Sequence, residues 1–154
     1  MKDKSKILAR CELFKTLPAE ALELIAAKAA PLEVNEGDPL IVEGKPSAFL
    51  YVIAEGTVDY IKRVDAKSGL VICRWAEGDV VGLDAVIDGK DYFVSAVAST
   101  PVKCLRLPAA DFHALCDADP QYEHRIYAQA LLIQSARLRQ ITQRLREFLA
   151  KILK

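Results

Sequence analysis

The sequence predicts a domain that is mainly β, with flanking helices and a long helix at its C-terminus. Between Pro31 and Pro108, short runs rich in Val, Ile, Tyr and Phe alternate with turn residues, which is typical of an antiparallel sandwich or barrel. All seven glycines of the chain lie in this stretch. After Pro120 the chain contains neither Gly nor Pro, so one uninterrupted helix of about 30 residues is expected there.

Composition favours one ordered domain. The chain has 154 residues, the size of a single domain, and 52% of them are hydrophobic. Lys and Arg together number 21, as do Asp and Glu, so no net charge attracts the chain to nucleic acid or to a membrane surface. The residues after Arg125 are locally basic, however. This basic stretch is interpreted as a solvated helix face, or alternatively as a surface for an acidic partner or nucleic acid.

The individual elements follow from turn signals and hydrophobic spacing. Two helices are predicted at 7–14 and 18–30, with Pro18 in a first helical turn and Pro31 ending the second helix. Strands are expected at 49–54, 57–64, 70–75, 92–98 and 102–107. Lys67-Ser68-Gly69 is the expected tip of a hairpin. A short helix should run from Pro108 to about Cys116, and the long helix should begin at Asp119-Pro120.

The long helix carries a heptad pattern. Apolar residues recur at the two core positions of about three heptads, with one Gln among them: Leu131, Gln134, Leu138, Ile141, Leu145, Phe148 and Ile152. The pattern predicts a homodimeric coiled coil. Its flanking positions hold Arg137, Arg144 and Lys151 on one side. These cations would face each other in an antiparallel pair, so a parallel two-fold dimer is expected. The alternative is a single amphipathic helix folded back on its own core.

Sequence motifs of catalysis, metal binding and membrane insertion are missing. There is no P-loop, GxSxG or HExxH sequence, and no nucleophile with a His and an acid in recognisable context, so an enzyme is not expected. The four cysteines lack metal-ligand spacing and are interpreted as small buried hydrophobes in a reducing cytoplasm. No apolar run approaches the ~18 residues that span a bilayer, and no secretory signal follows Met1. We therefore expect a cytoplasmic protein without a metal. His113 and His124 are interpreted as surface or capping residues rather than haem ligands.

A series of turn motifs, taken in order, makes the prediction more specific. Leu13–Pro18 precedes a helix, and the further motifs are Glu36-Gly37-Asp38, Glu43-Gly44-Lys45-Pro46, Leu50–Val58, Glu77-Gly78-Asp79 and Gly82. Their order and spacing resemble the cyclic-nucleotide-binding domain of the catabolite-activator and protein-kinase-A-regulatory superfamily over residues 13–140. The resemblance implies an eight-stranded antiparallel jelly roll with N-terminal helices at 7–120 and a dimerisation helix at 121–154.

The resemblance also implies a phosphate-binding cassette at residues 82–96. In the family, backbone N–H groups of a short helix and an Arg hold the cyclic phosphate, while a Glu accepts from the ribose hydroxyl. Here Leu83 stands at the Glu position and Tyr92 at the Arg position. Asp84 and Asp88 add negative charge, and Lys90 is the expected nearby cation. The candidate ligand-binding residues are Gly82, Leu83, Asp84, Ala85, Lys90, Tyr92, Phe93 and Ser95.

Two functions follow from this departure. The first is a regulatory sensor, a homodimer that relays the binding of a cyclic mono- or dinucleotide, or of a protein partner, through its long helix. A cyclic mononucleotide is then expected to bind weakly or in a non-standard way, and no cofactor is certain. The second is a protein-interaction scaffold that binds no nucleotide, with Tyr92 and Phe93 filling the emptied pocket. Tyr92 pointing into a filled interior favours the scaffold. Sequence-specific DNA binding is not expected, because no helix-turn-helix follows the heptads.

Overall fold

Two four-stranded antiparallel sheets form the centre of the molecule in the computed structural model, which describes residues 3–154. One sheet has the order β1-β8-β3-β6 and the other β2-β7-β4-β5. The strands are β1 (Ala30–Val34), β2 (Pro39–Ile41), β3 (Phe49–Glu55), β4 (Val58–Arg63), β5 (Gly69–Trp75), β6 (Val80–Val81), β7 (Ser95–Ala98) and β8 (Val102–Pro108). This arrangement, called the sandwich below, confirms the predicted eight-stranded architecture.

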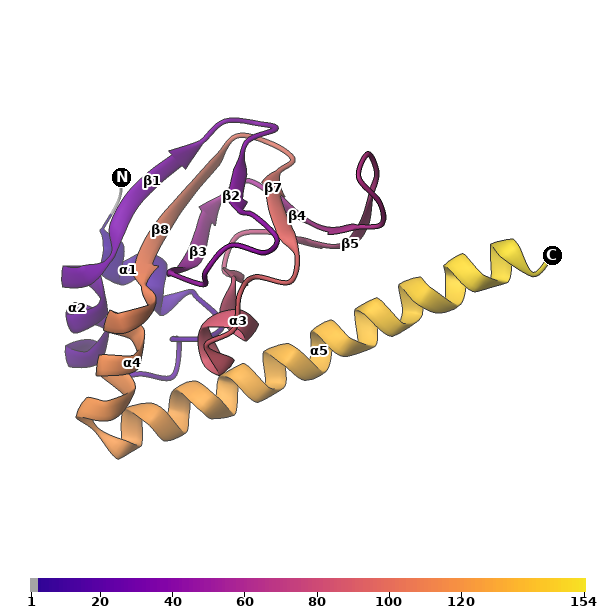
Figure 1. The fold of residues 1–154 in the computed structure, drawn as a ribbon. Helices are drawn as coiled ribbons and strands as arrows, with labels where there is room; N and C mark the ends of the chain where they lie inside the picture. The colour runs from indigo at the N-terminus through magenta and orange to yellow at the C-terminus, as the bar shows by residue number, and fades with distance from the viewer. Residues whose placement is uncertain (1–2) are drawn as a thin grey trace.

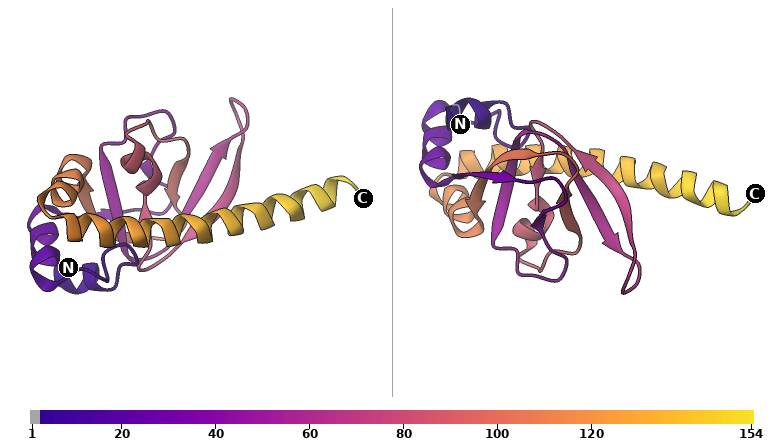
Figure 2. Two further views of the ribbon diagram at one scale, coloured as in Figure 1. Left: turned by 90° about the horizontal axis from the view of Figure 1, so that it is seen from below. Right: turned by 90° about the horizontal axis from the view of Figure 1, so that it is seen from above.

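Five helices flank the sandwich: α1 (Lys4–Ala9), α2 (Ala19–Lys28), α3 (Leu83–Asp88), α4 (Ala109–Ala118) and α5 (Pro120–Ile152). The Asp119 side chain accepts a hydrogen bond from the Gln121 N–H at 2.8 Å, which caps α5, and Pro120 suits its first turn. Figures 1 and 2 show α5 crossing beneath the sandwich, with its C-terminal half projecting beyond it. With 33 residues, α5 confirms the predicted long helix.

The predicted helix at 7–14 is wrong in its position. The helix α1 ends at Ala9, and a series of tight turns follows. The Cys11 carbonyl accepts from the N–H groups of both Phe14 and Lys15, and the Glu12 N–H donates to the Gly78 carbonyl. These bonds bend the chain so that Cys11 and Phe14 are fully buried, which a straight helix would not allow. Tertiary burial therefore overrides local helical spacing here.

Two hydrophobic clusters form the core. One lies between the helices and the β3, β6 and β8 strands, and it includes Phe14, Phe112 and Ile126. The other lies between the two sheets. All four cysteines are free and buried, as predicted. Gly56 lies at a turn with φ of 93°, and a Cβ there would come within 2.3 Å of the Pro101 carbonyl oxygen, so only glycine fits.

Candidate functional site

The short helix α3 occupies the place expected for the cassette, between β6 and β7. A left-handed glycine stands at each end: Gly82 with φ of 87° before the helix and Gly89 with φ of 70° after it. A side chain would strain either conformation. The backbone form of the cassette is thus present, and its two glycines define where the helix starts and stops.

Tyr92, at the Arg position, points into a filled interior. Its side chain is 5% exposed and belongs to the cluster between the sheets. The hydroxyl donates to the Phe49 carbonyl at 2.5 Å and accepts from the Phe49 N–H at 3.1 Å. The Tyr92 N–H also donates to the Lys45 carbonyl. These bonds hold residue 92 against the loop before β3, so the strand predicted at 92–98 begins only at Ser95.

The other positions that would hold a nucleotide are also part of the protein interior. Leu83, at the Glu position, is 0% exposed and packs in the helical cluster. Ala85 is buried in the second cluster. The Gly82 N–H at the start of the cassette donates to the Tyr60 hydroxyl at 2.9 Å. This donor is therefore already satisfied within the chain.

The remaining predicted residues lie at the rim. Lys90 is exposed, and its N–H donates to the Asp88 carboxylate at 3.1 Å. Phe93 is 55% exposed, so the interpretation of this side chain as pocket filling is wrong. The Ser95 hydroxyl is half-buried and accepts from the Glu43 N–H at 3.0 Å. Gly82, Leu83, Ala85 and Tyr92 therefore come together in the interior, whereas Lys90 and Phe93 stay outside.

The cation closest to the interior comes from α5, and sequence reasoning missed it. Arg137 is 6% exposed, and it donates to the Val80 carbonyl. Its guanidinium carbon lies 4.1 Å from the centre of the Trp75 ring and 5.8 Å from that of Tyr60, both within cation–π range. The spacing 126, 130, 137 puts Arg137 on the same helix face as the buried Ile126 and Ala130, and that was the available signal.

A small group of polar atoms surrounds this guanidinium. Within residues 3–154, Nε and Nη1 of Arg137, Oδ2 of Asp84 and Nε1 of Trp75 are buried and have no hydrogen-bond partner. Burial raises the pKa of Asp84, and the positive charge of Arg137 only partly opposes that shift. The cassette and α5 are therefore joined through a desolvated charge, a connection that runs from α3 to the long helix.

The heptad residues are largely uncovered by the sandwich. Leu131, Leu138, Leu145, Phe148 and Ile152 are 73%, 67%, 54%, 48% and 59% exposed, while Gln134 and Ile141 are half-buried. We call these seven residues the seam. The expectation that all three basic flanking residues face a partner is wrong, because Arg137 binds Val80 and the Arg144 guanidinium donates to the Val71 carbonyl at 3.1 Å.

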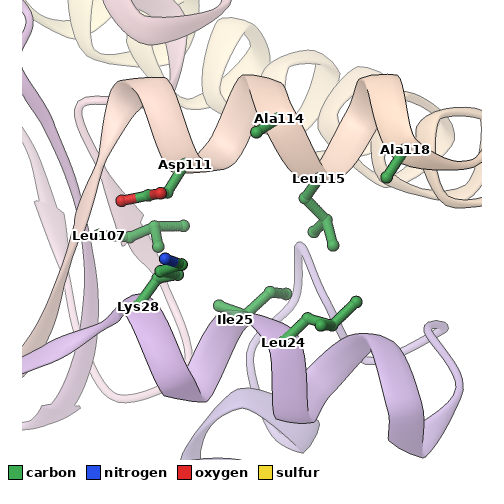
Figure 3. A pocket seen from close by; sticks show the side chains of 8 residues that line it. All are labelled: Leu24, Ile25, Lys28, Leu107, Asp111, Ala114, Leu115 and Ala118. Carbon is green, nitrogen blue, oxygen red and sulfur yellow. The ribbon is translucent and has the colours of Figure 1, made fainter.

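Two surface grooves lie away from the cassette. One separates α2 from α4, has a volume of about 190 Å³, and is lined mostly by apolar side chains, with Lys28 and Asp111 at one end (Figure 3). The other, of about 370 Å³, lies between β5 and α5. Over residues 3–154, no three His, Cys, Asp or Glu side chains are grouped to hold a metal. In the same part of the chain, no helix has the length and apolar character to cross a membrane.

Comparison with known proteins agrees with this geometry. The family model described as cyclic nucleotide-binding domain matches residues 31–119, so the chain belongs to that family. A cyclic nucleotide-binding domain from Methylobacillus flagellatus is 24% identical with a TM-score of 0.77, covering 92% of this chain and 79% of that one. The N-terminal domain of a transcriptional regulator from Streptomyces coelicolor is 24% identical with a TM-score of 0.68, covering 92% and 94%.

A third similar structure is the regulatory subunit of a cAMP-independent protein kinase A from Trypanosoma brucei. It is 24% identical with a TM-score of 0.68, and the match covers 82% of this chain and 49% of that one. Each of these likenesses shows the fold. The class is thus a cyclic nucleotide-binding domain of the regulatory type, and its ligand and partners are matters for the next subsection.

Proposed function

We propose that this chain is a non-enzymatic regulatory domain whose nucleotide site has become part of the core, and which acts as a homodimer through contacts along α5. The observation that carries the proposal is Tyr92, buried at the Arg position with its hydroxyl bonded to both backbone groups of Phe49. Leu83, equally buried, removes the second ligand contact. A cyclic phosphate would therefore meet an apolar interior rather than a positive charge.

The expected loss of affinity is large. Removing one charged hydrogen-bond partner costs about 1.5–3 kcal/mol, or roughly one to two decades in the dissociation constant. Two such contacts are missing here, so we expect cyclic AMP to bind with a Kd weaker than ~10 µM. The trypanosome relative is described as cAMP-independent, which supports the idea that this fold serves regulation without cAMP. A triple mutant of that relative, with one substitution that introduces an arginine, is described as bound to cAMP.

Calorimetric titration tests this expectation. Cyclic AMP, cyclic GMP and a set of cyclic dinucleotides should give no binding at sub-micromolar concentration. The double variant Leu83→Glu with Tyr92→Arg should bind cyclic AMP more tightly than the natural chain if the cassette backbone is intact. Tyr92→Phe is the matched control, since it removes the hydroxyl without adding charge. Sub-micromolar binding of cyclic AMP by the natural chain would sink the proposal.

The geometry of α5 supports a parallel dimer for a reason that differs from the charge argument. One residue turns the helix by about 100°, so Leu138 lies about a quarter turn from Arg137, the residue that faces the sandwich. The seam therefore faces sideways. A two-fold axis along the helices carries the partner's sandwich to the opposite side of the pair. An antiparallel pair centred on Leu138 would place both sandwiches on the same side, where they collide.

A ligand sensor is the second candidate, and the Arg137 contacts favour it. They connect the cassette residue Asp84 with α5 through a buried charge, so a ligand that displaces α3 would also disturb α5. The titration separates the two candidates. Binding of any cyclic nucleotide, accompanied by a change in the fluorescence of Trp75, favours the sensor, whereas silence toward the whole set favours the interaction domain. Trp75 is the only tryptophan, which makes it a specific reporter.

A further inference from the structure

The hairpin formed by β4, β5 and residues 64–68 has apolar side chains that its own chain does not cover. Leu70 is 45% exposed and Val64 is 67% exposed. Both sit near the free end of the hairpin, which stands away from α5 in both directions of view (Figures 1 and 2). Exposed apolar side chains on a projecting hairpin mark it as a contact surface.

The groove of about 370 Å³ opens between this hairpin and the distal half of α5. Leu70, Val71 and Ile72 line it on the hairpin side. Ile141, Leu145 and Phe148, three members of the seam, line it on the helix side. The groove and the seam are therefore one continuous apolar surface, so whatever covers the seam also enters the groove.

The course of the seam along α5 leads a partner helix into this groove. Seven residues fall about 20° short of two full turns, so a heptad stripe drifts around a straight helix. From Leu131 to Ile152 the drift is toward the face that carries Arg137 and Arg144, and both of these side chains contact the sandwich. A helix that follows the stripe consequently starts beside α5 and ends between α5 and the hairpin.

Two further apolar residues of α5 lie outside the seam and remain unexplained by a simple coiled coil. Leu149 is 44% exposed and Leu153 is 82% exposed. At about 100° per residue they lie on the side of α5 turned away from its own sandwich. We call this pair the flank. In a parallel two-fold dimer, the direction away from one sandwich is the direction of the other copy's sandwich and hairpin.

From these relations we infer that the hairpin of each copy closes over the flank of the partner's α5, so that Leu70 and Val64 of one copy pack on Leu149 and Leu153 of the other. The partner is a second copy of this chain, and the inference rests on the proposed dimer. Because the contact is isologous, it forms twice. It covers the apolar side chains of the hairpin and of the flank together, which a coiled coil of the seam alone would leave in water.

The test measures the dimer dissociation constant by sedimentation equilibrium. Leu70→Asp and Leu149→Asp should each weaken the dimer by about tenfold or more, because each places a charge in an apolar contact. Leu24→Asp is the matched control: Leu24 is an exposed leucine on α2, away from the hairpin, at 53% exposure, and its change should leave the constant within about twofold. Pairing Leu70→Asp with Leu149→Lys should recover part of the loss, since the two charges attract.

The outcomes separate the two claims. A natural chain that is monomeric at high concentration overturns the proposed dimer. A dimeric natural chain whose constant is unchanged by Leu70→Asp and by Leu149→Asp overturns the hairpin contact and leaves the seam dimer standing. A second measurement does not depend on stability: Leu70→Cys and Leu149→Cys copies, mixed and treated with a short bismaleimide, should give a cross-linked dimer that neither copy gives alone. No cross-link in a dimeric mixture speaks against the contact.

Discussion

Tyr92 and Arg137 together exchange the place of the positive charge in this domain. Tyr92 brings an apolar ring and a satisfied hydroxyl to the position where the family has its phosphate-binding Arg. Within residues 3–154, Arg137 is the one charged residue that is buried, and it enters from α5. Moving a guanidinium out of water is costly. Here two aromatic faces, one backbone carbonyl and the nearby Asp84 offset that cost.

Asp84 should make stability depend on pH. Its pKa in the fold lies above the ordinary 3.8, because burial disfavours the carboxylate. The folded state then binds the proton more tightly than the unfolded chain, so this residue lowers stability as pH rises from 3.8 through the raised pKa. Asp84→Asn should remove that slope. Urea unfolding at several pH values from about 4 to 7, followed by Trp75 fluorescence, measures it.

The comparison needs one control. Arg137 stays charged throughout this range, so losing its neighbour changes the stability of the Asn variant by the same amount at each pH. Asp88→Asn, at the exposed end of α3, removes a carboxylate without that burial. We expect the difference in unfolding free energy between the natural chain and Asp84→Asn to change with pH more than the difference for Asp88→Asn. A constant difference for Asp84→Asn would count against the assignment.

Among the elements, α5 has two separate tasks. Its first half fastens to the sandwich through Ile126, Ala130 and Arg137, all buried. Its second half leaves Leu138, Leu145 and Ile152 more than half exposed. A helix of this length spans about 50 Å, longer than the sandwich can cover. The apolar stripe therefore needs a second chain, and heptad spacing gives the geometry for one.

Leu138→Ala combined with Leu145→Ala tests this requirement. Each large apolar residue removed from a fully buried seam costs about 2–5 kcal/mol, so the double variant should be monomeric at micromolar concentration by light scattering. Leu132→Ala is the control, because Leu132 lies about a third of a turn from the seam and is 64% exposed. A double variant that remains dimeric would show that another face of α5 makes the contact.

At the scale of the whole molecule, charge is balanced and distributed for folding rather than for nucleic acid. The formal net charge is zero. Two of the basic residues in the C-terminal stretch, Arg137 and Arg144, are engaged with backbone carbonyls of the sandwich. Other cations pair with acids at the surface, such as Arg74 with Asp59 at 2.6 Å. Little positive potential is left to follow a phosphate backbone.

We therefore expect no sequence-specific binding to duplex DNA. Gel-shift titration should show at most weak binding, equal for unrelated sequences and lost as salt rises from 50 to about 200 mM, since phosphate attraction alone behaves in that way. Arg146→Gln, on the exposed side of α5, should reduce any such residual binding equally for all sequences. A footprint on one defined site at physiological salt would contradict the expectation.

The sequence by itself determined the eight strands, the long helix and the two substitutions in the cassette. These depend on local signals: glycines at turns such as Gly56, alternating apolar runs, and residue types at fixed positions such as Leu83 and Tyr92. Tertiary structure decided the rest. Whether Tyr92 or Phe93 fills the interior depends on the loop at Gly44 and Lys45, which is distant in sequence. The turns at Cys11, the burial of Arg137 and the diversion of Arg144 to Val71 also depend on distant partners. Heptad spacing identifies an apolar stripe, but only the packed sandwich shows which of its neighbours remain free for a second chain.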